Sequence, residues 1–210
     1  MPQLDFSVVG ADADRMAASP TVRLRLRVDE TTGTKVHAIA LRCQVRIEPL
    51  KRQYGDHEAE ALLDLFGERH RWGETLRTMR LAFLTHMVPS FTGATEVDLF
   101  LPCSYDFDVA ANKYLHALDD GEIPLTLMFN GTVFTSGPAG VAVEPVPWHK
   151  ECALRLPVAT YREAMDLHFP GTAWLRLGRE CFDALHRYRA RQGLTSWDDA
   201  VERLLKEAQP

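Results

Sequence analysis

The feature that most constrains the fold is a strict alternation of apolar and polar residues in two neighbouring segments. Residues 22–28 place Val or Leu at every second position with Arg between them, and residues 37–47 continue the same period. Successive side chains of a β-strand point to opposite faces, so this pattern predicts two half-buried strands. The connecting stretch DETTGTK includes Gly33, which can adopt a positive φ. We therefore expect an antiparallel hairpin with one apolar face and one basic face.

The basic face of this hairpin is the first candidate binding surface. Its members are Arg23, Arg25, Arg27, Arg42 and Arg46. If the hairpin is in register, alternation places these side chains together, and unpaired like charges on neighbouring strands cost free energy. Either acidic residues of a neighbouring helix pair with the arginines, which we favour, or the face binds an acidic partner.

The rest of the chain predicts a mixture of strands and helices. Strand-like segments occupy residues 4–10, 80–91, 95–102, 123–134 and 140–156. We expect the second and third of these to pair around the turn TGAT. Helical spacing occupies residues 56–66, 105–121, 159–169, 178–192 and 195–208. For the helix at 105–121, Ser104 is the expected N-cap. Asp106 and Asp108 carry negative charge beside the positive N-terminal end of the helix dipole, and Gly121 can end the helix.

These elements together predict an α+β fold. Residues 1–168 form a curved antiparallel sheet packed with helices, and residues 169–210 form a C-terminal helical extension packed on it. A β-sandwich with helical decoration is the alternative fold. The chain has 210 residues, of which 46% are hydrophobic, and this is enough for a sizeable core.

Composition narrows the class of partner. The formal net charge of −5 gives no general attraction to nucleic acid or to an anionic membrane. The N-terminal residues lack the pattern of a secretory signal, and no apolar run approaches the roughly 20 residues of a membrane helix. The cysteines form no C-x-x-C pair. We expect a cytoplasmic protein with reduced thiols.

A histidine and a cysteine three residues apart, His149 and Cys152, have the spacing of a metal-ligand pair. In a strand, residues three apart point to opposite faces, so one ion cannot bind both without a bulge. We therefore expect Trp148, Cys152, Leu154 and Leu156 to face the core and His149 to face solvent. On the earlier strand, His37 shares the apolar face and is expected to be a buried histidine.

Catalytic signatures are absent from the sequence. It contains no G-x-S-x-G elbow, no G-x-x-x-x-G-K-[ST] phosphate loop and no G-x-G-x-x-G. The carboxylates Asp106, Asp108, Asp119, Asp120 and Glu122 resemble an acid–base cluster but are better explained by a helix N-terminus and a solvated turn. A metal-dependent enzyme or metal carrier that uses some of His57, His70, His86 and the cysteines is the alternative function.

The chain resembles two known families. The stretches ETTGTKVHAIALRCQVRIEP, VPSFTGATEVDL and KYLHALDDGEIPL are similar to an uncharacterised, chiefly actinobacterial family, whose members are often encoded near nickel-iron hydrogenases. Over residues 4–168, the order of strand pairs, a helix closed by Gly-x-x-Pro and a final helix resembles SecB-like export chaperones. That resemblance implies a small antiparallel sheet with helices on one side, a homo-oligomer, and apolar grooves that hold unfolded clients.

Aromatic residues beside irregular segments are the second candidate binding surface. They are Phe66, Trp72, Phe83 and Phe91. Such residues either cover the edge of the core or line a groove for peptides. For each residue considered by itself, we favour burial at the core edge. We predict a non-enzymatic binding protein without cofactor, either a SecB-like chaperone or an assembly factor for a hydrogenase system. Its partner is a protein client or a hydrogenase component.

Overall fold

The computed structural model describes residues 2–103, 109–137, 140–172 and 177–208. It divides the chain into two compact units, Met1–Thr172 and Ala173–Pro210. The predicted boundary was residue 168. That the helical extension packs on the sheet domain stays a prediction.

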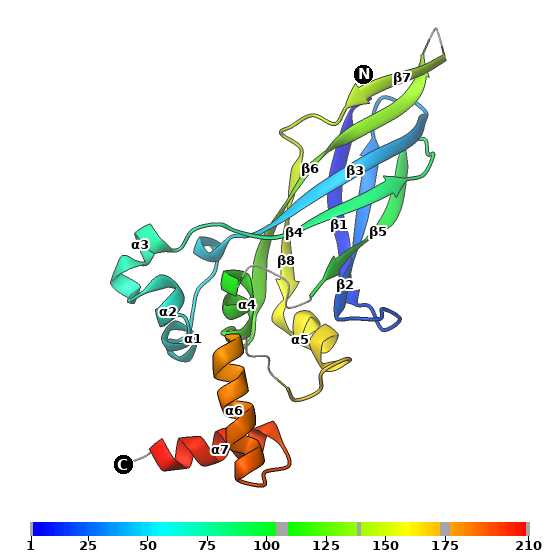
Figure 1. The fold of residues 1–210 in the computed structure, drawn as a ribbon. Helices are drawn as coiled ribbons and strands as arrows, with labels where there is room; N and C mark the ends of the chain where they lie inside the picture. Colours follow the sequence, from blue (N-terminus) through cyan, green and yellow to red (C-terminus); the bar gives the residue numbers. More distant parts are fainter. Residues whose placement is uncertain (1, 104–108, 138–139, 173–176, 209–210) are drawn as a thin grey trace. The chain divides into compact units, whose positions relative to one another are not determined.

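The first unit contains two antiparallel sheets (Figure 1). Sheet A has the order β1-β2-β5, formed by Leu4–Ala13, Thr21–Glu30 and Ala94–Pro102. Sheet B has the order β4-β3-β6-β7, formed by Met79–Val88, Val36–Ile47, Glu122–Gly137 and Gly140–Pro145. The strand β8, Glu151–Pro157, pairs with the first half of β6, and β7 pairs with the second half.

The core lies between these two sheets. The alternating apolar residues of β2 and β3 are buried, as their period predicts. The rings of Phe6 on β1 and Phe129 on β6 stack with their centroids 4.4 Å apart, so the two sheets touch through their inner faces. The mixed α+β class with antiparallel strands is confirmed, but the single curved sheet is wrong. The two-sheet arrangement is that of the alternative fold.

The predicted hairpin between β2 and β3 does not form. Instead β2 pairs with β1 and β5, and β3 pairs with β4 and β6, so residues 31–35 carry the chain from one sheet to the other. The buried carboxylate of Glu30 holds this crossing: it accepts hydrogen bonds from the backbone of Gln3, Thr32 and Thr34 and from the Thr32 hydroxyl. Burial raises the pKa of Glu30, but these bonds outweigh it and leave the pKa below its ordinary value.

The expected pairing of 80–91 with 95–102 is also wrong. The strands β4 and β5 belong to different sheets, and the turn between them is a second crossing. At this crossing Gly93 has a φ of 78°, and its carbonyl accepts a hydrogen bond from the backbone of Glu30. The two crossings are thus bonded to each other.

The long strand β6 contains a glycine that no other residue can replace without rearrangement. Gly131 has a φ of 142°, and a Cβ at this position would lie 2.1 Å from the carbonyl oxygen of Ala40 on β3. Backbones therefore approach more closely here than a side chain permits. Beyond Gly131 the partner of β6 changes from β8 to β7, because residues 146–150 separate the two strands.

Short helices cover one end of the first unit (Figure 1). They are α1 (Asp56–Ala61), α2 (Leu63–Phe66), α3 (Trp72–Thr75), α4 (Val109–His116) and α5 (Val158–Asp166), with 3-10 turns at Pro49–Lys51 and Arg69–Arg71. The single helix predicted over 56–66 is broken at Leu62. The predicted capping residues Ser104, Asp106 and Asp108 lie outside the described residues.

The second unit is a pair of helices, α6 (Arg179–Arg191) and α7 (Trp197–Ala208). Phe182 lies 5.4 Å from Trp197, and the Arg189 guanidinium lies 4.0 Å from the Trp197 ring centroid. Ser196 and Asp199 bond reciprocally at the start of α7, since each side chain accepts the backbone N–H of the other. Ser196 thus caps α7, and the two predicted final helices are confirmed.

Candidate binding surface

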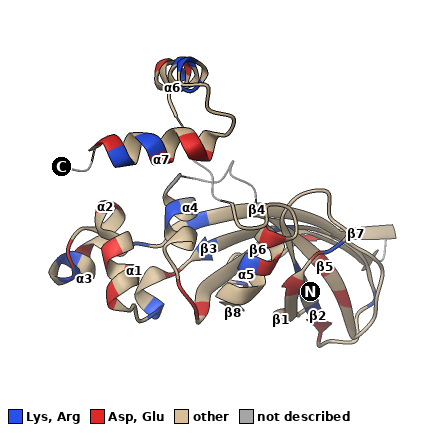
Figure 2. Ribbon diagram, turned by 90° about the horizontal axis from the view of Figure 1, so that it is seen from below, with Lys and Arg blue, Asp and Glu red and all other residues tan. Residues whose placement is uncertain are grey.

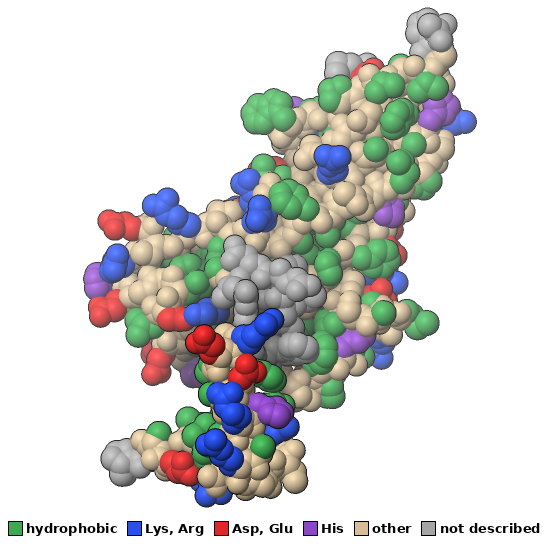
Figure 3. All heavy atoms as spheres, in the orientation of Figure 1, with side chains coloured by type: hydrophobic (Ala, Val, Ile, Leu, Met, Phe, Trp, Pro, Cys, Tyr) green, Lys and Arg blue, Asp and Glu red, His purple; other side chains and the backbone are tan. Residues whose placement is uncertain are grey.

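The outer face of sheet B carries exposed apolar side chains. Register places Met87 of β4 beside Ala40 of β3, and Ala38 of β3 beside Phe134 of β6, which in turn adjoins Val143 of β7. We name as the apolar face Ala38, Ala40, Phe83, Met87, Met128, Phe134, Val141 and Val143. The largest exposed fractions are those of Phe83, Met87, Val141 and Val143, between 61% and 67%. Figure 3 shows hydrophobic side chains gathered over β3, β4 and β6 with a few basic groups among them.

Three arginines lie on the same outer face, and among the described residues none of them forms an ion pair. Arg46 donates to the amide oxygen of Gln44 at 3.3 Å, and Arg80 lies over the ring of Phe83 at 5.4 Å. Arg46 stands opposite Arg80 across β3 and β4, and Arg42 is exposed. Like charges directly opposite each other destabilise a sheet, so this end of the face favours a ligand that carries a carboxylate.

The outer face of sheet A is different, because its arginines already have acidic neighbours. Arg23 forms an ion pair with Asp12 at 2.6 Å, and Arg27 forms one with Asp29 at 2.8 Å. Arg25 lies opposite Asp98 of β5. Figure 2 shows the acidic residues of β1, β2 and β5 in red.

The arginine stripe predicted from the sequence is therefore divided between two sheets. Arg23, Arg25 and Arg27 lie on sheet A, and Arg42 and Arg46 lie on sheet B. The carboxylates beside the first group belong to the strands of sheet A, Asp29 to β2 itself and Asp12 and Asp98 to the neighbouring strands, and not to a helix.

Of the four predicted aromatic residues, Phe83 alone is exposed. Phe66 and Phe91 are buried, as the core-edge alternative expected. Trp72 is half-buried, donates its indole N–H to the carbonyl of Gly67 and meets Tyr54 edge-on at 5.1 Å. These residues line no common groove. Met87, Val141 and Val143 were not among the predicted binding residues. On β7 the valines alternate with Ala142 and Glu144, so the local pattern predicts that the valines face the core.

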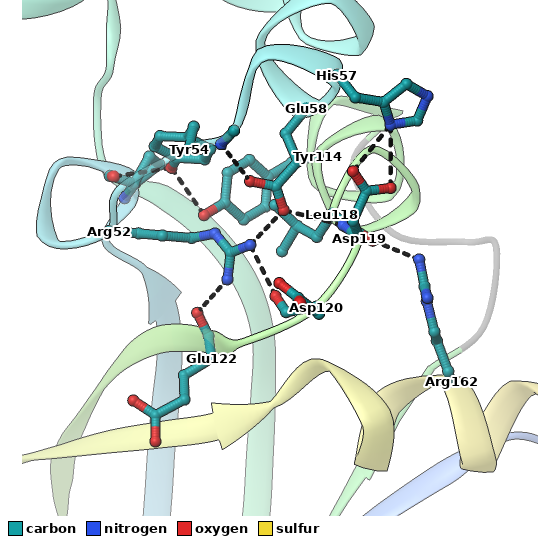
Figure 4. Close-up of polar contacts among 12 residues, drawn as sticks. Arg52, Tyr54, His57, Glu58, Tyr114, Leu118, Asp119, Asp120, Glu122 and Arg162 are labelled. Atoms are coloured by element: carbon teal, nitrogen blue, oxygen red, sulfur yellow. Dashed lines mark hydrogen bonds and ion pairs between the residues drawn. The ribbon is translucent and has the colours of Figure 1, made fainter.

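A polar cluster around Arg52 is the second candidate site (Figure 4). Arg52 and Glu58 form an ion pair in which both side chains are more than nine-tenths buried. Arg52 also donates to the carbonyls of Asp120 and Glu122, at 2.8 and 2.7 Å. Glu58 further accepts the backbone N–H groups of Gly55 and Asp119.

This Arg52 cluster joins the start of α1 to the turn before β6. Its groups bond to one another, except that the buried Nε of Arg52 has no hydrogen-bond partner among the described residues. Beside it, the hydroxyls of Tyr54 and Tyr114 are 2.9 Å apart, and burial raises the pKa of Tyr114 to about 12. The cluster borders an open cleft of about 520 Å³. A carboxylate held by this many donors is poorly placed to move protons, so we assign the cluster a structural role.

The histidines and cysteines do not converge. His57 bonds to Asp119 at 2.8 Å, which raises the pKa of His57, and His70 lies 3.2 Å from Glu68. No group of three or more His, Cys, Asp or Glu residues that could hold a metal ion occurs in the described part of the chain. Burial raises the pKa of the Cys43 and Cys103 thiols to about 12, so both are protonated at neutral pH.

Two predicted orientations are wrong. Trp148 is 88% exposed, since β8 begins only at Glu151 and the strand period does not extend back to it. His37 is exposed and bonds to the Ser136 hydroxyl at 2.8 Å. A bulge between Val36 and Ala38 makes His37 the extra residue of the strand and turns it outward.

Comparison with known proteins identifies a family but no function. Residues 1–210 match the family described as "Family of unknown function (DUF6084)". No curated protein matches the chain. No helix among the described residues is long and apolar enough to cross a bilayer.

Solved structures share only a distant likeness with the chain. A beta-glucosidase from Kluyveromyces marxianus is 9% identical with a TM-score of 0.28; the match covers 73% of this chain and 15% of that one. A late embryogenesis abundant protein is 14% identical with a TM-score of 0.34, and the match covers 75% and 73% of the two chains. An ApaA protein from Bordetella pertussis is 12% identical with a TM-score of 0.28, covering 74% and 95%. Likenesses at this level carry no functional argument.

Proposed function

The chain belongs to DUF6084, a family of unknown function, and we propose that it is a non-enzymatic binding protein. It holds an apolar segment of a protein client on the apolar face of sheet B. The observation that supports this proposal most directly is the exposure of Phe83 and Met87 on one sheet face. Exposed apolar patches of this kind mark surfaces for proteins in soluble domains.

The mechanism is reversible burial without a cofactor or a covalent step. Burying one exposed Phe or Met side chain stabilises a complex by about 1.5–3 kcal/mol. Two or three such anchors supply about 3–9 kcal/mol before the cost of ordering a flexible client is subtracted, so binding is weak and reversible. Such binding suits a chaperone of the SecB-like kind.

The unpaired arginines define the preferred client further. Arg42, Arg46 and Arg80 favour apolar segments that also contain carboxylates, and their charge accelerates encounter at low salt. We predict that one such client is a component of a hydrogenase system in the cytoplasm.

The test is binding of a fluorescent peptide that alternates leucine and glutamate, followed by anisotropy. The double variant Phe83→Ser/Met87→Ser is expected to weaken binding about tenfold or more, because it removes the central anchors. The matched control is Phe100→Ser, since Phe100 is 50% exposed on the outer face of sheet A, and this variant should bind as the unaltered protein does.

Two outcomes would contradict the proposal. One is equal affinity of the double variant and the unaltered protein for the peptide, together with equal suppression of aggregation of an unfolded client. The other is stoichiometric, tightly bound metal in protein purified without an affinity tag, which would favour the metal-dependent alternative.

A further inference from the structure

The strand β7 is a free sheet edge. It lies at the end of sheet B, and within the described residues its side away from β6 has no strand partner. Its six residues, GVAVEP, contain no lysine and no bulge, and proline occurs only at the last position. Val141 and Val143 are 67% and 61% exposed. Natural proteins protect exposed edges with lysines, bulges, prolines and inward-pointing charges. Of these β7 has Glu144 and the terminal Pro145, which leave the backbone groups of Val141 and Val143 open to pairing with another chain.

Register shows which backbone groups of β7 are available. The backbone N–H of Val146 donates to the carbonyl of Gly131 at 3.0 Å, so residues 131 and 146 are a hydrogen-bonded pair. In antiparallel pairs, hydrogen-bonded and non-hydrogen-bonded positions alternate. Ala142 and Glu144 therefore direct their backbone groups toward β6, and Val141 and Val143 direct theirs toward the free edge.

We propose that a second copy of the chain pairs with this edge, antiparallel, about a two-fold axis at Ala142. Val141 of each copy then lies opposite Val143 of the other, and both residues use their free N–H and C=O groups. The two sheets B become one continuous sheet, and the apolar faces of the two copies adjoin. Such a contact is isologous and closes on itself.

Charge and register both favour this arrangement. Glu144 lies opposite Gly140 of the other copy, so no like charges face each other, while Val141 packs against Val143. If the register shifts by two residues toward Pro145, Val141 lies opposite that proline, which has no N–H to donate. A shift the other way places Val143 opposite a position outside β7.

The size of the contact sets its strength. β7 contributes 6 residues per copy, whereas a standard stable interface has roughly 20–30 residues per side. The dimer is therefore weak, with a Kd on the order of 100 µM, and it is populated in concentrated solution.

Disulfide trapping tests the register. In a background of Cys181→Ser, which removes the exposed cysteine, Ala142→Cys should oxidise to a covalent dimer, since directly opposite residues have Cα atoms within disulfide range. Val141→Cys alone and Val143→Cys alone should not, because in this register each residue lies roughly 8 Å from its own copy across the axis. An equimolar mixture of those two variants should cross-link. Met16→Cys, at a 93% exposed position, measures random collision.

Sedimentation tests the contact without a cross-link. The unaltered protein should move from 23.7 kDa toward twice that mass as its concentration rises to about 500 µM. Val143→Pro removes an N–H that faces the edge and leaves the bonds to β6 intact, so it should stay monomeric with an unchanged circular dichroism spectrum. Val141→Lys/Val143→Lys is a second disruptive variant, should the proline perturb the strand.

The proposal is overturned if the unaltered protein remains monomeric at that concentration, if Ala142→Cys cross-links no faster than Met16→Cys, or if the edge variants dimerise normally. Phe83→Ser/Met87→Ser should dimerise like the unaltered protein. Failure of the dimer and failure of client binding are thus separate results.

Discussion

The two sheets share one core but have unlike outer faces. On sheet A, Arg23 and Arg27 form ion pairs with carboxylates of the same sheet. On sheet B, Phe83 and Met87 are exposed, and Arg46 faces Arg80. Matched charges are already satisfied by their neighbours and by water, so sheet A gains little from a partner. Sheet B gains by burying apolar area and by neutralising its arginines, which is why we place binding there.

The substitution with the largest expected effect is Gly131→Ala, which should disrupt sheet B and leave sheet A as the less affected of the two. The new Cβ would clash with the carbonyl of Ala40, and the φ of 142° is strained for alanine. We expect the free energy of unfolding to fall by about 3 kcal/mol or more, measured by urea denaturation. Gly33→Ala is the control: its φ is 78°, but a Cβ there meets no atom within 4 Å, so the loss should be about 1 kcal/mol. Equal losses would show that the close approach is unimportant.

A second substitution, Glu30→Gln, weakens the crossing that holds the two sheets together. Glu30 is 4% exposed and accepts hydrogen bonds from Gln3, Thr32 and Thr34. Loss of charge-assisted bonds should cost about 1–3 kcal/mol at pH 7.

The contribution of Glu30 to the free energy of unfolding should depend on pH. Because its folded pKa is lowered, its stabilisation is fully present above the ordinary carboxyl pKa of 4.5 and is lost as pH falls through the lowered value. Denaturation curves of the unaltered protein and Glu30→Gln should therefore converge in acid. A difference that persists or grows below that range would contradict the assignment.

The smallest effects, with opposite signs, should come from removing one arginine on each face. Arg23→Ala leaves Asp12 without its partner and should lower the Tm slightly, as expected for an exposed ion pair. Arg80→Ala relieves its repulsion with Arg46 and should leave the Tm unchanged or raise it. Differential scanning calorimetry at low salt measures both, and high salt should shrink both shifts. The same sign for both variants would mean that the two faces do not differ in charge balance.

Periodicity predicted most individual strands but not their partners. The alternation in β2 and β3 correctly identified their buried residues, since side-chain direction in a strand depends only on local geometry. The choice of partner strand does not depend on local geometry alone, because any two amphipathic strands can lie side by side. One signal was overlooked: the inward positions of β2 end at Glu30, and a buried carboxylate at the end of a strand needs several hydrogen-bond donors. Thr32 and Thr34 of the connection and Gln3 before β1 supply them.

The candidate site was only partly predictable for the same reason. Phe66, Phe83 and Phe91 were all binding candidates, and core burial was the favoured prediction for each alone. Phe66 and Phe91 are buried and Phe83 is exposed, a difference that depends on the elements packed over them. His37 and Trp148 were assigned to the wrong face because a bulge and a late strand start interrupt the period. Irregularities of this kind depend on neighbouring strands and leave little trace in the local sequence.

The sequence by itself determined the α+β class, the alternating strands, the two final helices and the arginine-rich character of β2, because these follow from side-chain period and local capping. The tertiary structure alone decided that β2 and β3 lie in different sheets, that carboxylates cover one set of arginines, and that β7 is an edge. Those outcomes depend on which backbone edges meet in space. The free energy of such pairings is shared among residues far apart in the chain.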